Sequence, residues 1–181
     1  MKFDSILQHN IMGCFATGVT LVMTRDGDDV WGMTANAITS RSLNPHLVLK
    51  AVDRRSSIHQ YTRDGQRFAI SVLGVENDMI SSAFATPEPK DIPELALVVG
   101  ATGSPIAADS VGYVDCVLGR TLSGGDQDIF IGRAVDGLMP DGRSLIFFRG
   151  KYCELAHETF NGKIPSDSYT LEDTCKCYGS F

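Results

Sequence analysis

Short apolar runs rich in β-branched residues, separated by turn-forming pairs, limit most strongly how this chain can fold. The run 19–24 (VTLVMT) is followed by the turn 25–29 (RDGDD), and the run 111–122 by the turn 123–126 (SGGD). Asp-Gly and Gly-Gly pairs between runs of this kind indicate hairpins. Because hairpins join antiparallel neighbours, the pattern favours an antiparallel barrel over a parallel, doubly wound sheet.

Periodicity along the whole chain predicts about eight strands and three short helices. A helix is expected over 3–15, where apolar residues recur at spacings of three and four and form one face. The proline-rich segment 86–93 predicts a surface loop, and 94–108 is weakly patterned. Further helices are expected over 56–63 and 76–84, and strands over 19–24, 30–35, 47–52, 67–73, 111–122, 127–135, 145–149 and 152–155.

Composition excludes several classes of protein. With 181 residues, 43% of them hydrophobic, the chain is long enough for one domain with a core. A net charge of −6 argues against nucleic acid as a main partner. No apolar run approaches the roughly 20 residues of a membrane helix. The first ten residues lack the unbroken apolar segment of a signal peptide, so a cytoplasmic location is expected.

The five cysteines do not form a disulfide framework, because their number is odd and their spacing irregular. Cys14, Cys116 and Cys153 lie among apolar residues and are expected to be reduced packing residues. Cys175 and Cys177 form a CxC pair near the end of the chain. Such a pair is half a metal site at most, so no metal is expected.

The stretch 32–59 carries the strongest sign of a ligand. A segment expected to be a loop holds small polar side chains: Thr34, Asn36, Thr39, Ser40 and Ser42. After an apolar strand, residues 53–57 (DRRSS) place two cations and two hydroxyls at the expected start of a helix, which suits an anion. Together these parts suggest a phosphorylated ligand with a ring. The alternative is that these residues serve local turns, caps and a solvated surface.

Motifs for other chemistry are absent from the sequence. There is no P-loop, no GxGxxG motif after a strand, no HExxH and no GxSxG. The four histidines are scattered, and His59 is expected to be a partly exposed surface residue rather than a catalytic one. A polar ligand site without an acid–base group fits proteins whose cofactor carries the chemistry, so no catalytic side chain is assigned.

The segment 15–61, followed by RFAISVL (67–73), closely resembles the flavin reductase-like family. These are small flavin-binding split-barrel proteins, often the reductase components of two-component flavin monooxygenases. The resemblance covers about residues 6–155 and is most specific in the first half. It rests on FATGV (15–19), GMTANA (32–37), Thr39-Ser40, SLNP (42–45) and Asp53-Arg54 with Ser56, and more loosely on GSP (103–105), Gly125-Asp126 and RGKY (149–152).

The resemblance implies a mainly β fold: a six-stranded antiparallel Greek-key split barrel with short flanking helices. It also implies a homodimer with flavin at or near the subunit interface. Residues 1–155 would form this domain and 156–181 a tail or arm. The activity implied is hydride transfer from NADH or NADPH to FMN or FAD, with the reduced flavin passed to an oxygenase.

Carried over position by position, the family's flavin contacts fall on the stretch singled out above. Thr34, Asn36 and Ala37 would face the flavin ring, and Thr39 and Ser40 the ribityl chain. The backbone of Ala51 and Val52 would lie near the ring, with Phe84 a further candidate at its far end. The phosphate would be surrounded by Asp53, Arg54, Ser56 and Ser57.

The expected nicotinamide side consists of Gln127, Phe148, Arg149 and Tyr152. The family often has histidine at the positions of Gln127 and Phe148, so the flavin site is the better matched of the two. This difference motivates one alternative, a flavin-binding electron-transfer protein without NAD(P)H reactivity. Another is a heme or pyridoxal phosphate binder, for which Lys50 is the one lysine in the stretch able to form a Schiff base.

Overall fold

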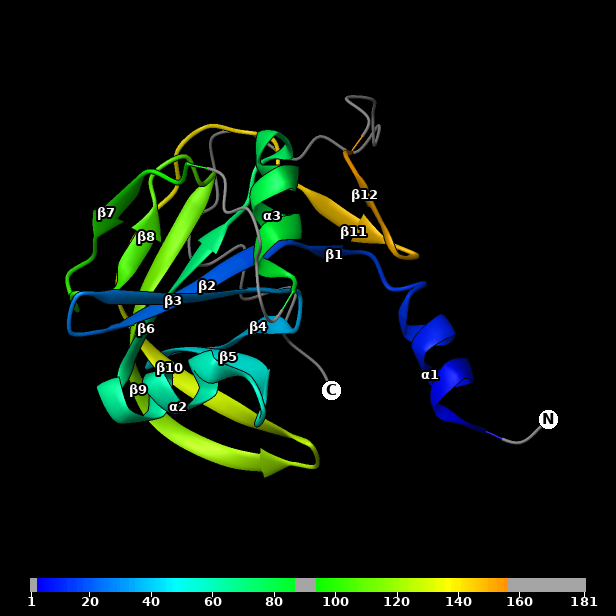
Figure 1. Cartoon of the computed structure of the whole chain (residues 1–181), viewed down its shortest axis with the longest axis horizontal. Helices are drawn as coiled ribbons and strands as arrows, with labels where there is room; N and C mark the ends of the chain where they lie inside the picture. Colours follow the sequence, from blue (N-terminus) through cyan, green and yellow to red (C-terminus); the bar gives the residue numbers. More distant parts are fainter. Residues whose placement is uncertain (1–2, 87–93, 156–181) are drawn as a thin grey trace.

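The computed structural model describes residues 3–86 and 94–155, and one seven-stranded antiparallel sheet dominates it (Figure 1). The strand order is β3-β2-β6-β9-β10-β5-β4. The mainly β, antiparallel prediction is confirmed, although the sheet has seven strands where six were expected. Its strands are β2 (Thr20–Asp26), β3 (Asp29–Ala35), β4 (Ile38–Leu43), β5 (His46–Asp53), β6 (Arg67–Val72), β9 (Gly112–Gly124) and β10 (Gln127–Leu138).

Two small sheets and the helices surround this sheet. The weakly patterned segment 94–108 contains a two-stranded sheet that the sequence did not predict. The elements are the strands β1 (Thr17–Gly18), β7 (Leu97–Val99), β8 (Pro105–Ala107), β11 (Ile146–Phe148) and β12 (Lys151–Cys153), the helices α1 (Ser5–Met12), α2 (Ser57–Gly65) and α3 (Asp78–Phe84), and the 3₁₀ turn η1 (Val75–Asn77).

Strand β2 is buried on both faces and separates two apolar clusters. Val22 packs with Phe68 and Phe130 in one cluster. Leu21 and Met23 point the other way into a second cluster, over which α3 packs. A strand covered on both faces has no polar face, which is why residues 19–24 read as a continuous apolar run.

Strand β4 corrects the sequence interpretation of residues 38–43. These residues were expected to lie in a polar loop, but they pair with β5 along Ile38–Leu43. The pairing has a register shift between Ser40 and Ser42, which leaves Arg41 as a bulge. As an edge strand with exposed hydroxyls, β4 lacks the apolar alternation by which strands are recognised.

Helix α1 forms as expected but buries none of its side chains. It lies apart from the main sheet in Figure 1, connected to it through β1. Its apolar face is exposed, with Ile6 71% accessible. Cys14 and Cys153 are also exposed, so of the three cysteines expected to pack only Cys116 does.

The predictions about a membrane helix, the tail and the proline-rich loop concern residues that the structure describes only in part. No helix among the described residues is long and apolar enough to cross a membrane. The expected tail 156–181, with Cys175 and Cys177, lies outside the described residues, as does most of the loop 86–93.

Candidate functional site

The flavin-ring residues predicted from the sequence come together where β3 meets β4 and β5. The turn between β3 and β4, which holds Asn36 and Ala37, is fixed from both sides. The Thr20 hydroxyl donates to the carbonyl oxygen of Ala35 at 2.6 Å, and the Ala51 N–H donates to that of Ala37 at 3.1 Å. The β3–β4 corner, residues 34–40, is therefore a rigid surface beside the end of β5.

The β3–β4 corner presents polar groups outward. Asn36, Thr39 and Ser40 are exposed, and among the described residues the Asn36 carboxamide has no hydrogen-bond partner. Thr34 differs, because its hydroxyl donates to the carbonyl oxygen of Ser81 in α3 at 2.7 Å. A ligand at this corner would find an amide and two hydroxyls on a backbone that is already ordered.

The start of α2, next to this corner, lacks a side-chain cap. Ser56 has the extended backbone of an N-cap residue, but its hydroxyl does not cap the helix. Ser57 is exposed at the first helical position. The first N–H groups of a helix lack partners within the helix and favour a negative charge. Ser56 and Ser57 thus lie at an uncapped helix start, and their contact with a phosphate stays a prediction.

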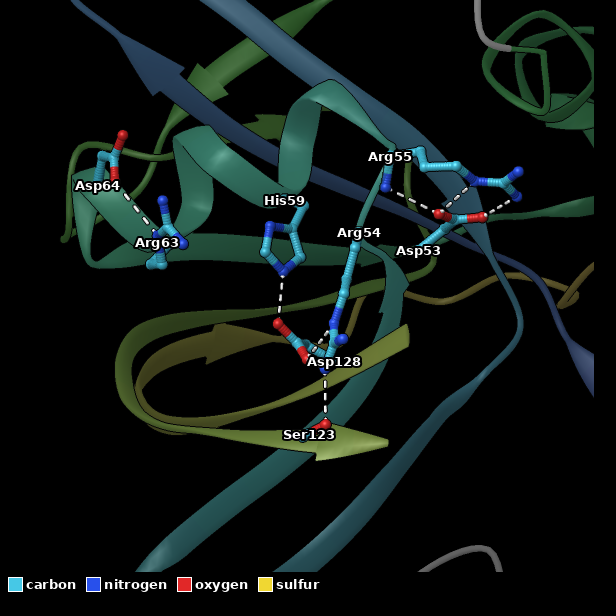
Figure 2. A network of polar contacts seen from close by, with 8 residues as sticks. All are labelled: Asp53, Arg54, Arg55, His59, Arg63, Asp64, Ser123 and Asp128. Carbon is cyan, nitrogen blue, oxygen red and sulfur yellow. Dashed lines mark hydrogen bonds and ion pairs between the residues drawn. The ribbon is translucent and has the colours of Figure 1, made fainter. Parts of the chain in front are cut away.

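Arg54 and His59 converge on Asp128, and Arg54 also reaches Ser123 (Figure 2). Arg54 donates to Asp128 Oδ1 from Nε at 2.8 Å and from Nη2 at 2.7 Å, and Nη2 also donates to the Ser123 hydroxyl at 2.6 Å. His59 Nε2 lies 2.8 Å from Asp128 Oδ2. Hydrogen bonds from Arg54, and then from His59, lower the pKa of Asp128. The carboxylate joins the loop before α2 to the β9–β10 hairpin.

The surface position predicted for His59 is wrong. His59 is only 7% exposed, and the centre of its ring lies 5.1 Å from that of the Phe130 ring. His59 is buried because Asp128, a residue 69 positions later, satisfies its ring nitrogen. Sequence spacing within α2 holds no information about that contact.

Arg55 takes a different direction from Arg54. Its guanidinium pairs with Asp53 Oδ2 at 2.7 Å, and its backbone N–H donates to Asp53 Oδ1 at 2.8 Å. The Arg55 side chain is 87% exposed. Hydrogen bonds from Arg55 lower the pKa of Asp53 to about 2, so this carboxylate is ionised at neutral pH.

The predicted nicotinamide residues are not gathered into one place. Gln127 pairs in register with Asp53, beside the start of α2. Phe148 and Arg149 lie at the turn between β11 and β12, in a different sheet, with the Arg149 guanidinium 5.3 Å from the Phe148 ring centre. Tyr152 donates to or accepts from the Ser81 hydroxyl at 2.8 Å.

Phe84 also has a structural role in this chain. Its ring lies against Gly32 of β3, where a Cβ atom would come within 3.0 Å of it. The ring belongs to the second apolar cluster. A contact with the far end of a flavin stays a prediction.

A groove of about 400 Å³ runs beside β4 and β10. It begins at Ser40 in the β3–β4 corner and continues over apolar side chains. These include Leu47, Val48, Ala134 and Val135. Among the described residues, no group of three or more His, Cys, Asp or Glu side chains could hold a metal ion.

Comparison with known proteins agrees with this geometry. The sequence model of the flavin reductase like domain matches residues 12–156. The chain belongs to this family. An NADH-dependent FAD reductase from Streptomyces globisporus is 32% identical over 166 residues, covering 88% of this chain and 91% of that protein.

Two further comparisons bear on this flavin reductase-like chain. The reductase component of a 4-nitrophenol 4-monooxygenase/4-nitrocatechol 2-monooxygenase from Rhodococcus opacus is 29% identical over 143 residues, which cover 79% of this chain and 77% of that protein. A solved structure of a Streptomyces globisporus NADH:FAD oxidoreductase, in complex with NAD and FAD fragments, superposes with a TM-score of 0.81 at 32% identity. It covers 86% of this chain and 95% of that one.

Sequence reasoning missed Asp128 and Ser123. A weak signal for Asp128 exists, because it stands beside the apolar run Ile129–Ile131 near the start of β10. A carboxylate next to buried positions needs a cationic partner. The sequence does not show which cation that is, since Arg54 and His59 reach it only through the pairing of β5 with β10.

Proposed function

We propose that this chain is an NAD(P)H:flavin oxidoreductase that transfers hydride from NADH or NADPH to FMN or FAD and supplies reduced flavin to a monooxygenase. The observation that carries the proposal is the uncapped start of α2 beside the exposed polar β3–β4 corner, in a chain of the flavin reductase family. The names of its relatives support the nicotinamide, the flavin and the oxygenase component.

The described residues fit a flavin. Asn36 and Ala37, with Thr34 beneath them, would border the ring next to the backbone of Ala51 and Val52. Thr39 and Ser40 would contact the ribityl hydroxyls, and residues 53–57 would contact the phosphate. The bound flavin would supply the hydride acceptor. The chain's part is to hold the ring flat against the corner and to exclude water from the face where the nicotinamide stacks.

A visible spectrum and an NADH oxidation assay test this function directly. Purified protein with added FMN or FAD is expected to oxidise NADH or NADPH, and the visible absorbance of the flavin should bleach in the absence of oxygen. Absence of turnover with every pairing of nicotinamide and flavin would contradict the proposal.

A second candidate is a flavin-binding electron-transfer protein on the same fold. The contact between the Arg149 guanidinium and the Phe148 ring favours it, because this contact takes up the ring that was expected to stack on the nicotinamide. This protein would be purified yellow and would be reduced by a protein donor but not by NADH. A pyridoxal phosphate binder is disfavoured, because Lys50 has no exposed surface with which to reach a carbonyl ligand.

We also propose a homodimer. The exposed apolar side chains of α1 and its flanks are Phe3, Ile6, Ile11, Met12 and Phe15. Several large apolar side chains gathered on one short segment are rarely left in water. A second copy would cover it, and could bring the Phe148–Arg149 turn of one chain towards the β3–β4 corner of the other.

Light scattering after gel filtration tests the dimer. The wild-type mass is expected to be about twice the 19.6 kDa of one chain. The double variant Ile6→Glu/Ile11→Glu should shift the mass towards that of one chain, because two buried charges would oppose association. Gln8→Glu, on the same helix, serves as the control and should stay dimeric. A wild-type protein that elutes as a monomer at micromolar concentration contradicts the proposal.

A further inference from the structure

Arg54 is bound to the β9–β10 hairpin by both its backbone and its side chain. The Arg54 N–H donates to the carbonyl oxygen of Asp126 at 3.3 Å. Its guanidinium makes the three contacts with Asp128 and Ser123 described above. The side chain of Asp128 is only 15% exposed. Turning Arg54 towards a ligand would break all the guanidinium contacts and leave a largely buried carboxylate with His59 as its remaining partner.

Arg55 is held much less firmly. Its one side-chain partner among the described residues is Asp53, two positions earlier, and the pair is open to solvent. Exposed ion pairs of this type contribute little to stability. If the Arg55 guanidinium moved away, Asp53 would keep the hydrogen bond from the Arg55 backbone N–H, so the turn before α2 would keep its shape. Figure 2 shows the two arginines leaving the loop in different directions.

We propose that Arg55, and not Arg54, is the cation that binds the phosphate of the flavin, while Arg54 positions the phosphate loop by holding it to Asp128 and Ser123. The inference rests on the proposed flavin-binding function and assigns roles within that site. A phosphate dianion at Ser56 and Ser57 would replace the Asp53 carboxylate as the partner of the exposed Arg55 guanidinium. The planar guanidinium suits a bidentate contact with phosphate oxygens.

The test compares the affinities of FMN and riboflavin, which differ by the phosphate. For Arg55→Ala we expect FMN to bind about tenfold more weakly, with riboflavin affinity and melting temperature unchanged. Arg55→Lys should recover part of the preference for FMN, since it keeps the charge but not the fork. Arg63→Ala, which removes another exposed arginine of α2 paired with its neighbour Asp64, is the matched control and should change neither affinity.

Arg54→Ala should behave differently. It should lower the melting temperature and weaken FMN and riboflavin by similar factors, because the whole loop shifts, and Arg54→Lys should restore much of both affinities. The inference is overturned if Arg54→Ala weakens FMN selectively, or if Arg55→Ala weakens both flavins equally. A wild-type protein that binds neither flavin overturns the proposed function and this assignment with it.

Discussion

Replacing Lys50 with methionine is expected to stabilise the folded protein by about 2–4 kcal/mol at pH 7. Lys50 of β5 is fully buried. Its amine lies 4.1 Å from the Phe68 ring centre and 5.4 Å from that of Phe130. The hydrogen bond from its amine to the Thr62 hydroxyl is long at 3.4 Å. Among the described residues no carboxylate pairs with it. Methionine has a similar length and needs no solvation.

The effect should depend on pH in a defined direction. Burial lowers the pKa of Lys50 from 10.5 to about 7. Between these two values the unfolded chain binds a proton that the folded chain does not. Wild-type stability therefore rises with pH, by about 1.4 kcal/mol per unit from this group. The penalty is greatest below pH 7 and disappears towards pH 10.5, so the advantage of the methionine variant shrinks as the pH is raised.

Denaturant unfolding at pH 6, 7, 8 and 9 measures this directly. Burial raises the pKa of Cys116 to about 12, so this thiol lowers the stability of wild type and variant alike at the upper end of the range and cancels in the comparison. Lys151→Met removes an exposed lysine of β12 and is the control, expected to change stability by less than about 0.5 kcal/mol. Parallel stability curves for wild type and Lys50→Met would show that the buried amine carries no such penalty.

Asn36→Leu is expected to weaken flavin binding by about 1–3 kcal/mol, or roughly fivefold to 150-fold, without loss of stability. The side chain is exposed, and the backbone on either side of it is held by Thr20 and Ala51 rather than by the carboxamide. Folding therefore does not need the amide, whereas a bound heteroaromatic ring edge would lose a hydrogen-bond partner and meet an apolar side chain instead.

Flavin titration followed by fluorescence quenching gives the affinity, and thermal unfolding without flavin gives the stability. Asn44→Leu, an exposed amide at the other end of β4, is the matched control and should bind flavin as the wild type does. Unchanged flavin affinity in a folded Asn36→Leu protein would remove the β3–β4 corner from the site.

The strands recognised from the sequence are those whose local pattern is complete. The runs 19–24, 47–52 and 67–73 are apolar and β-branched, and the hairpin turns at 25–29 and 123–126 are marked by glycine, so β2, β5, β6, β9 and β10 appear close to where they were expected. Strand β4 was missed because an edge strand needs few apolar residues. Its serine and threonine residues are typical of a loop, but its backbone pairs with β5.

The candidate site divides in the same way. Asn36, Ser40, Ser56 and Ser57 were predicted as ligand residues, and the structure leaves all four accessible or uncapped along β5 and just beyond its end. Arg54 was predicted with them, but its guanidinium is occupied by Asp128 and Ser123, which lie 74 and 69 residues later. Composition shows that two arginines are present and does not show which one already has a carboxylate.

By itself the sequence determined the antiparallel β class, the hairpin order and the polar stretch that marks the flavin family, because each depends on residues close together in the chain. The burial of Lys50 and His59, the separate partners of Arg54 and Arg55, and the uncovered face of α1 were decided by tertiary structure. Each depends on which distant strand or helix packs against the residue, and a buried or paired charge is specified by that neighbour rather than by local periodicity.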